Sequence, residues 1–205
     1  MDCKRVYLLR HGQTDWNARG LLQGESDVPL NDIGREQARR ANSTMKAFDP
    51  QQVWASPLSR AFETAQLATG WPAERLRVVE ALAEMRVGSW ASLTYSQVSR
   101  QFPEDFAAWE ADPYRHAPTG GESFNDLRAR LSPLAQAIAD EPCERLLIVS
   151  HGQALRALLA EILDLSSDLA WRMVFDNCHY TELTYWNKPW LVRHNCPAHR
   201  EGGSL

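Results

Sequence analysis

The sequence predicts an α/β fold in which a mostly parallel sheet is covered by helices on both faces. Two short apolar runs, residues 6–9 and 146–149, are each followed within two residues by a His-Gly pair, and such runs are typical of strands buried on both faces. Short apolar segments alternate with segments of helical periodicity, a pattern that favours parallel strands joined by helices. A chain of 205 residues is long enough for one well-buried core, so a single domain over residues 1–205 is expected.

The first half of the chain contains the strand that leads to the first His-Gly pair and the two strands that follow it. Asn31 is a favourable N-cap for the first long helix. The preceding loop is long and rich in glycines and amides, which favours a functional role. The expected elements are a strand over 6–9, a loop over 13–30, a helix over 31–48, a strand over 53–55, a helix over 58–68 and a strand over 76–79.

The second half begins with a segment in which aromatic residues accumulate. Residues 85–122, roughly, are expected to form a small helical cap with its own core that shapes substrate access. Ser123 and Asp126 resemble a capping box, and a closing hairpin can add an antiparallel edge to the sheet. The expected elements after the cap are a helix over 124–140, a strand over 146–150, helices over 155–162 and 169–175, and strands over 180–185 and 190–192.

Composition favours an ordinary globular protein of the cytoplasm. The formal net charge of −4 gives no general attraction to nucleic acid. No apolar run is long enough to cross a bilayer, and the N-terminus lacks the apolar segment of a signal peptide. The four cysteines, at positions 3, 143, 178 and 196, are dispersed without a CxxC pair, which suits a reducing compartment.

The C-terminal stretch offers a weak metal motif. His194, Cys196 and His199 could supply half of a metal site. Pro197 and the glycines that follow it favour instead an irregular tail over about residues 195–205. No metal or other cofactor is therefore expected.

Several polar residues follow the ends of predicted strands and are expected to meet at one edge of the sheet. Guanidinium and imidazole groups in one crevice suit a phosphoryl group, because they supply positive charge and many donors. A neutral imidazole can attack phosphorus, and a nearby carboxylic acid can protonate the departing alkoxide. Glu80 and Glu84 both follow the third strand and compete for that acid role. The collected residues are Arg10, His11, Arg60, Glu84 and His151, with Asn17 and Gln23 on the long loop.

These residues belong to an ordered set of short motifs that resembles the histidine phosphatase superfamily, in its phosphoglycerate-mutase-like branch. The motifs are Leu9-Arg10-His11-Gly12-Gln13-Thr14, Asn17, Pro29-Leu30, Gly34, Gln37-Ala38, Ser56-Pro57-Leu58-Ser59-Arg60-Ala61, Thr64-Ala65, Glu84 and Ser150-His151-Gly152.

The resemblance implies a three-layer α/β/α sandwich and a role for each matching residue. His11 would be the phosphorylated nucleophile, and Glu84 the general acid and then the base for water. The phosphoryl oxygens would be bound by Arg10, Arg60 and His151, with help from Asn17 and the backbone at Gln23 and Gly24.

The family pattern also separates two activities. The small phosphatases often have G-x-W-E-G after the acid, whereas here Gly88-Ser89-Trp90 is followed by Ala91-Ser92, so the resemblance does not imply the usual substrate-side contacts. The chain lacks the insertion common in mutases and carries Gly120-Gly121-Glu122-Ser123, as many of the phosphatases do. A metal-independent phosphomonoesterase acting on a small phosphorylated metabolite is therefore the favoured prediction.

Two other functions stay open at this point. One is a cofactor-dependent phosphoglycerate mutase, and the other is a regulatory module that binds phosphate without chemistry. Sugar phosphates, phosphoglycerates, α-ribazole phosphate and fructose 2,6-bisphosphate all fit the family as substrates. The sequence does not predict the oligomeric state.

Overall fold

The computed structural model describes residues 4–198, and its core is one mixed six-stranded sheet in the order β3-β2-β4-β1-β5-β6. The first four strands in this order are parallel, and β5 and β6 form an antiparallel hairpin at one edge. The expected parallel sheet with an antiparallel edge is therefore confirmed. The strands are β1 (Lys4–Arg10), β2 (Gln52–Ala55), β3 (Arg77–Val78), β4 (Arg145–Ser150), β5 (His179–Tyr185) and β6 (Pro189–Pro197).

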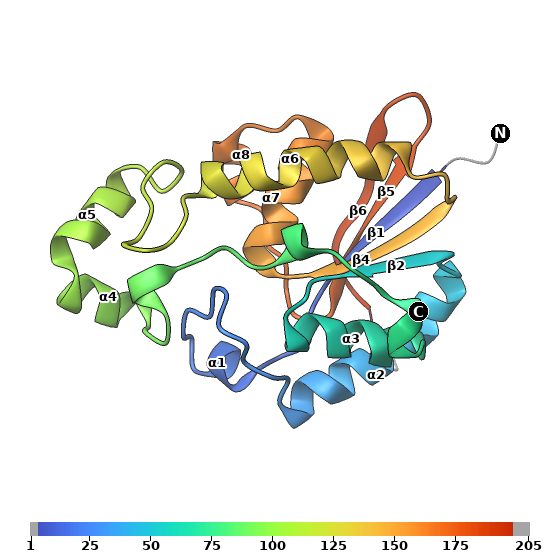
Figure 1. Ribbon diagram of the computed structural model, residues 1–205, viewed down its shortest axis with the longest axis horizontal. Helices are drawn as coiled ribbons and strands as arrows, with labels where there is room; N and C mark the ends of the chain where they lie inside the picture. The colour runs from blue at the N-terminus through green and yellow to red at the C-terminus, as the bar shows by residue number, and fades with distance from the viewer. Residues whose placement is uncertain (1–3, 199–205) are drawn as a thin grey trace, which may run out of the picture.

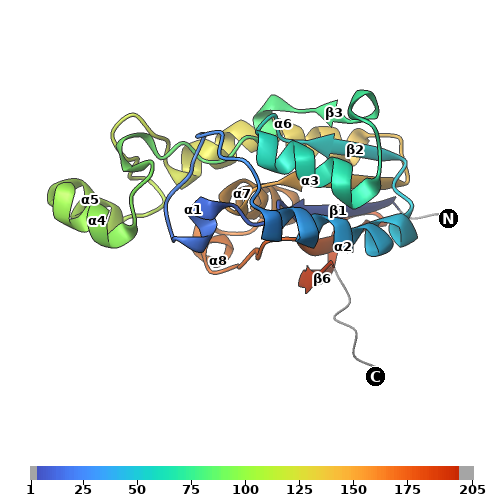
Figure 2. The same ribbon diagram turned by 90° about the horizontal axis from the view of Figure 1, so that it is seen from below.

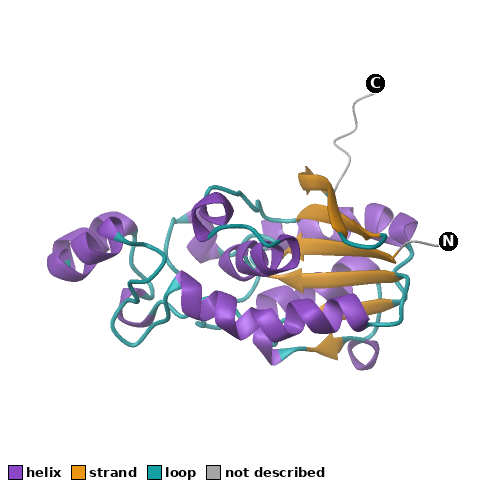
Figure 3. Ribbon diagram, turned by 90° about the horizontal axis from the view of Figure 1, so that it is seen from above, coloured by secondary structure: helices purple, strands orange, loops and turns teal. Residues whose placement is uncertain are grey.

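Helices cover both faces of the sheet and complete three layers (Figures 1 and 3). Successive strand residues alternate between the two faces: Tyr7 and Leu9 pack in the core cluster that contains residues of α2 and α3, and Leu8 packs in the cluster of α6 and α7. The helices are α1 (Asp15–Ala18), α2 (Asp32–Phe48), α3 (Ser59–Thr69), α4 (Tyr95–Gln101), α5 (Pro103–Ala111), α6 (Phe124–Asp140), α7 (Gly152–Leu163) and α8 (Ser167–Trp171), with short 3-10 turns at Ala73–Arg75, Glu80–Leu82 and Gly88–Trp90.

The predicted cap is a pair of helices, α4 and α5, that projects from the end of the molecule opposite the N-terminus (Figures 1 and 2). Its aromatic side chains form the expected small core. Trp109 stacks on Tyr95 with ring centroids 5.3 Å apart and meets Trp90 edge-on at 5.7 Å. The same indole lies 6.1 Å from Trp171 of α8, so the aromatic core ties the cap to the main body.

The long loop after β1 is more structured than the sequence indicates. Thr14 and Asn17 form a capping box around the one-turn helix α1. A backbone bridge between Thr14 and Leu30 closes the loop at its base. Asn31 then caps α2 as predicted, because its side chain accepts a hydrogen bond from the Gly34 N–H at 2.8 Å.

Several predicted boundaries at the sheet edge and beyond need correction. The edge strand β3 has two residues rather than four, and the short helix α8 covers 167–171 rather than 169–175. The last strand, β6, reaches Pro197, so an irregular tail cannot begin at residue 195. Its irregular backbone, with register shifts and a left-handed Asn195, hides the strand periodicity in the sequence.

The described part of the chain was compared with the expectations about a metal site and about membrane-spanning segments. No group of three or more His, Cys, Asp or Glu side chains within residues 4–198 is placed to hold a metal ion. His199, the last member of the weak metal motif, lies outside the described residues. None of the helices within the same range is long and apolar enough to span a membrane.

Two glycines position the segment that carries His11. A Cβ on Gly34 would lie 2.0 Å from the Gln13 carbonyl oxygen, and one on Gly12 would lie 2.4 Å from the Gly34 carbonyl oxygen. The first turn of α2 therefore packs directly on the backbone that follows β1. Only glycine allows this approach.

We expect Gly34→Ala to destabilise the protein by about 1–3 kcal/mol in urea unfolding, because the new methyl group meets rigid backbone. Helix propensity alone would instead stabilise it by about 1 kcal/mol, so the sign of the change tests the packing. Ser43→Ala, at an exposed site on the same helix, is the control and should stay within about 0.5 kcal/mol of wild type. An equally or more stable Gly34→Ala protein would contradict the close approach.

Candidate active site

Parallel pairing of β1 with β4 brings the two His-Gly pairs together. Arg10 lies opposite Ser150 in the register, so His11 and His151 follow at the same edge of the sheet. The His11 backbone N–H also donates to the Ser150 carbonyl oxygen at 2.9 Å. The two imidazole rings lie 5.1 Å apart between centroids, at an interplanar angle of 60°.

The hydrogen bonds of His11 determine which of its nitrogens is free. Nδ1 lies 2.7 Å from the Gly12 carbonyl oxygen, which can only accept, so Nδ1 carries the proton. Nε2 is then left with its lone pair. Burial, reinforced by the charges of Arg10 and Arg60, holds the pKa of His11 well below 6.5. The ring is therefore a neutral imidazole with one free nitrogen, as a nucleophile requires.

His151 is fully buried, and its ring lies beside that of His11 rather than on the cavity wall. Its Nε2 lies 2.7 Å from the Ser56 hydroxyl, which in turn accepts from the Leu58 N–H. Because this oxygen has two lone pairs, the hydroxyl can donate to Nε2 or accept from it, and the proton of the neutral ring can lie on Nε2 or on Nδ1. That Nδ1 is buried without a hydrogen-bond partner among the described residues. Burial, again with the charge of Arg60, lowers the pKa of His151 well below 6.5.

Two guanidinium groups lie near the imidazoles, and within residues 4–198 neither makes a hydrogen bond to a carboxylate. Arg10 donates to the Phe175 carbonyl oxygen. Arg60, near the start of α3, donates to the carbonyl oxygens of Ser26 and Gly24 at 2.7 and 2.8 Å. The Nε atoms of both arginines are buried without a partner among residues 4–198. An anion bound at this point would satisfy these donors.

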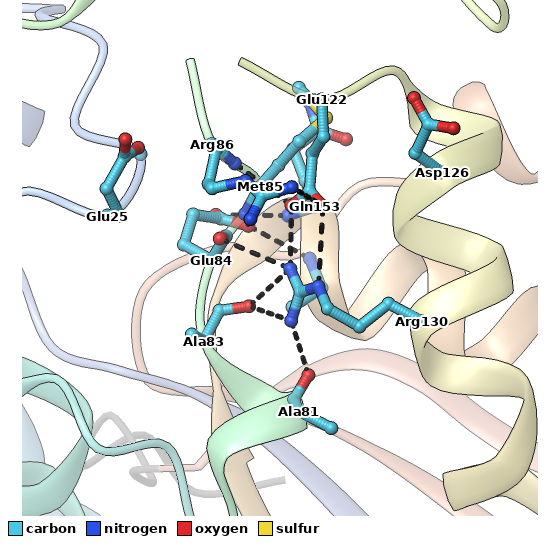
Figure 4. A network of polar contacts seen from close by, with 12 residues as sticks. Glu25, Ala81, Ala83, Glu84, Met85, Arg86, Glu122, Asp126, Arg130 and Gln153 are labelled. Atoms are coloured by element: carbon cyan, nitrogen blue, oxygen red, sulfur yellow. Dashed lines mark hydrogen bonds and ion pairs between the residues drawn. The ribbon is translucent and has the colours of Figure 1, made fainter. Parts of the chain in front are cut away.

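Of the two glutamates that compete for the acid role, Glu84 lines the cavity and Glu80 does not. Glu84 accepts hydrogen bonds from the backbone N–H groups of Met85, Gln153 and Ala154, at 2.8, 3.2 and 3.0 Å (Figure 4). The last two belong to the first turn of α7, next to His151. Glu80 is exposed in a 3-10 turn and does not line the cavity.

The three predicted loop residues line the same cavity and also hold the loop together. Asn17 completes the capping box of α1, and the buried Gln23 accepts from the Thr14 hydroxyl at 3.0 Å. Gly24 has a left-handed backbone, with φ of +51°, and its carbonyl oxygen holds Arg60. Their contacts to a phosphoryl group remain predictions.

The cavity has a volume of about 270 Å³ and is lined by both polar and apolar side chains. The polar lining includes His11, Arg10, Arg60, Glu84 and Asp176, and the apolar lining includes Trp90 and other residues of the cap. Arg156 of α7 also lines the cavity.

Sequence reasoning missed two residues of this site. Arg156 lies one turn into α7 and lines the cavity, with its Nε buried and without a partner among the described residues. Its only signal is its place five residues after His151. Asn177 donates from its side chain to the His11 carbonyl oxygen at 2.9 Å, and nothing in its local sequence distinguishes it.

The strand ends of this α/β sandwich bring together a free imidazole nitrogen, unpaired guanidinium donors and a carboxylate. This combination is typical of an enzyme that handles phosphoryl groups. Residues 6–197 match the histidine phosphatase superfamily (branch 1), and the chain belongs to that family. The resemblance derived from the ordered motifs is thereby confirmed.

Relatives cover most of the chain. A glucosyl-3-phosphoglycerate phosphatase of Mycobacterium tuberculosis is 36% identical over 174 residues, 80% of this chain and 78% of its own. Phosphoglycerate mutase-like protein 4 of Arabidopsis thaliana is 37% identical over 77% of this chain and 70% of its own. Among solved structures, a putative α-ribazole-5'-P phosphatase of Escherichia coli superposes with a TM-score of 0.89 at 26% identity, covering 96% of this chain and 98% of that one.

The buried neutral histidines predict how stability depends on pH. In the unfolded chain each takes up a proton near pH 6.5, whereas in the folded state each stays neutral to much lower pH. Their contribution to the free energy of unfolding is thus fully present above pH 6.5. It is lost as the pH falls below 6.5, by up to about 1.4 kcal/mol per pH unit for each histidine. Urea unfolding at about pH 7 and about pH 5.5, in phosphate-free buffer, measures this loss.

His11→Gln and His151→Gln should each lose less stability on acidification than wild type does, because each removes one titrating group. If both variants lost as much stability on acidification as wild type does, the histidines would be protonated in the folded state.

Proposed function

We propose that the protein hydrolyses small phosphate monoesters through a phosphohistidine at His11. The observation that carries this proposal is the hydrogen bond from His11 Nδ1 to the Gly12 carbonyl oxygen, which leaves Nε2 free beside unpaired guanidinium donors. Phosphatases among the relatives support hydrolysis, and a phosphohistidine mechanism is general to the family.

In the first step Nε2 of His11 attacks phosphorus, and the bond from phosphorus to the ester oxygen breaks. Arg10, Arg60 and His151 donate to the three remaining phosphoryl oxygens, where negative charge is spread in the transition state. Glu84 gives its proton to the departing alkoxide, which leaves as an alcohol.

In the second step water attacks the phosphorus of phosphohistidine. The Glu84 carboxylate takes one proton from the water, the phosphorus–nitrogen bond breaks, and inorganic phosphate leaves. Both His11 and Glu84 then return to their starting states. No metal takes part in either step, and all groups required are side chains of this chain.

The substrate we propose carries a second anionic group. Arg156 lies in the same cavity, donates to the Gln153 side-chain oxygen at 2.9 Å and packs 5.5 Å from the Trp171 ring centre, while its Nε stays unpaired among the described residues. A carboxylate or second phosphate would match it. Two of the relatives have names that contain phosphoglycerate, a compound with a carboxylate near its phosphate.

The protein is further proposed to act in the cytoplasm, which the free thiols of Cys143, Cys178 and Cys196 support.

Release of inorganic phosphate from a panel of phosphorylated metabolites, with and without EDTA, tests the proposed activity. Wild type should turn over at least one ester equally well in chelator. His11→Ala should lose at least about a thousandfold of kcat, because no other group replaces the nucleophile. Glu84→Gln should lose about 10²–10⁴-fold and Glu80→Gln almost nothing.

Other outcomes would favour other functions. Interconversion of 2- and 3-phosphoglycerate stimulated by 2,3-bisphosphoglycerate, with little phosphate released, would identify a mutase. Binding of vanadate without turnover of any ester would favour a regulatory module. Loss of activity in EDTA would contradict the metal-independent mechanism.

Arg156→Met tests the second anionic group. Its kcat/KM for 3-phosphoglycerate should fall by about tenfold to a hundredfold, because a hydrogen bond to a charged group is worth about 1.5–3 kcal/mol. For p-nitrophenyl phosphate, which has no second anion, the change should stay below about threefold. Arg172→Met, at an exposed arginine, is the control. Equal losses on both substrates would refute this specificity role.

A further inference from the structure

Glu84 lies on a segment without regular secondary structure, between the 3-10 turns at Glu80–Leu82 and Gly88–Trp90. The backbone of this segment is therefore not fixed by the hydrogen bonds of a sheet or helix. Its side chain is held from one direction by the first turn of α7. The backbone of the segment needs support from other parts of the chain.

Arg130 of α6 provides this support through backbone carbonyl groups. Its guanidinium group donates to the carbonyl oxygen of Ala81 at 2.6 Å, to that of Ala83 at 3.2 Å from two nitrogens, and to that of Glu84 at 3.4 Å (Figure 4). One side chain thus joins three of the four residues that lead into and include the candidate acid.

Glu122 pairs with Arg130 and also forms hydrogen bonds to the backbone that follows Glu84. Its carboxylate, only 2% exposed, lies 2.7 Å from Arg130 Nη2 and accepts from the Arg86 backbone N–H at 3.0 Å. The Glu122 N–H donates to the Arg86 carbonyl oxygen at 2.9 Å. The pair therefore fixes backbone on both sides of Glu84, at Ala83 and at Arg86.

This arrangement matters because a general acid works only within hydrogen-bond reach of the leaving oxygen. A displacement of about 1 Å can cost about a hundredfold in rate. A flat guanidinium group can reach several carbonyl oxygens and a carboxylate at once, whereas a lysine ammonium is a single point of charge.

We infer that Arg130, paired with the buried Glu122, is a positioning residue that holds Glu84 where its carboxyl group can protonate the leaving oxygen. The inference rests on the proposed function, in which Glu84 is the acid. Arg130 itself does not line the cavity and touches no reacting atom.

Arg130→Lys tests the inference, because it keeps the charge next to Glu122 but cannot reproduce the contacts to three carbonyl oxygens. The measured quantity is kcat/KM, which reports the phosphorylation step, for phenyl phosphate and for p-nitrophenyl phosphate. Phenolate needs a proton to leave readily, and p-nitrophenolate does not. Two substrates of similar size thus differ mainly in their need for the acid.

Arg128→Lys is a matched control on the same helix. Arg128 is similarly shielded, pairs with Glu161 at 2.7 Å and donates to Ser167, but makes no contact with the Glu84 segment. It reports the general cost of replacing a partly buried arginine of α6. Urea unfolding of both variants shows whether they are equally folded.

Arg130→Lys should lose about tenfold more kcat/KM on phenyl phosphate than on p-nitrophenyl phosphate, a fraction of the 10²–10⁴-fold that a general acid contributes. Glu84→Gln should show the same selectivity, to a larger degree, and Arg128→Lys none. Equal losses on the two substrates in Arg130→Lys, beside a selective Glu84→Gln, would overturn the inference alone. A Glu84→Gln without selectivity would overturn the role of Glu84 in the proposed function, and the inference with it.

Discussion

Buried guanidinium groups that make no hydrogen bond to a carboxylate within residues 4–198, at the ends of β1 and β4, are the constraint on which the rest of the structure depends. Removing a guanidinium group from water costs several kcal/mol unless its donors are satisfied. Arg10 and Arg60 meet that cost only in part, through backbone carbonyl oxygens, and keep unpaired Nε atoms within the described part of the chain. Burial, reinforced by the same charges, holds the pKa of His11 well below its ordinary value. One set of cations therefore both favours a phosphoryl group and preserves the neutral imidazole that attacks it.

The surrounding architecture delivers these groups from distant parts of the chain. Parallel pairing of β1 with β4 sets the two imidazoles side by side, and the contact between Gly12 and Gly34 places helix α2 directly against the backbone after His11. In the same cavity, the carboxylate of Glu84 is held by backbone N–H groups of α7, and the segment that carries it is held by Arg130 of α6. The aromatic cap closes the cavity with an apolar wall. Rigid elements thus hold the groups that must act together.

The sequence was most informative where local pattern determines position in space. A strand that ends in Arg10-His11 and another that ends before His151 must place these residues at one edge of a parallel sheet, so the centre of the site was predictable. Arg130 and Arg156 were not, because each is one of the many arginines of the chain, lies on a helix, and acts on residues far away in sequence or in another layer. The two edge strands of the sheet were difficult to predict for a different reason. In β3 both residues are exposed, and in β6 register shifts break the alternation that reveals a strand.

The central claim is that the free Nε2 of His11 takes the phosphoryl group. Rapid quenching of the enzyme with a 32P-labelled ester, followed by peptide mapping, tests it most directly. The account predicts label that is stable in alkali and lost in acid, on the peptide that contains His11. Label on the peptide of His151, or release of phosphate with no labelled protein at any time, would contradict it.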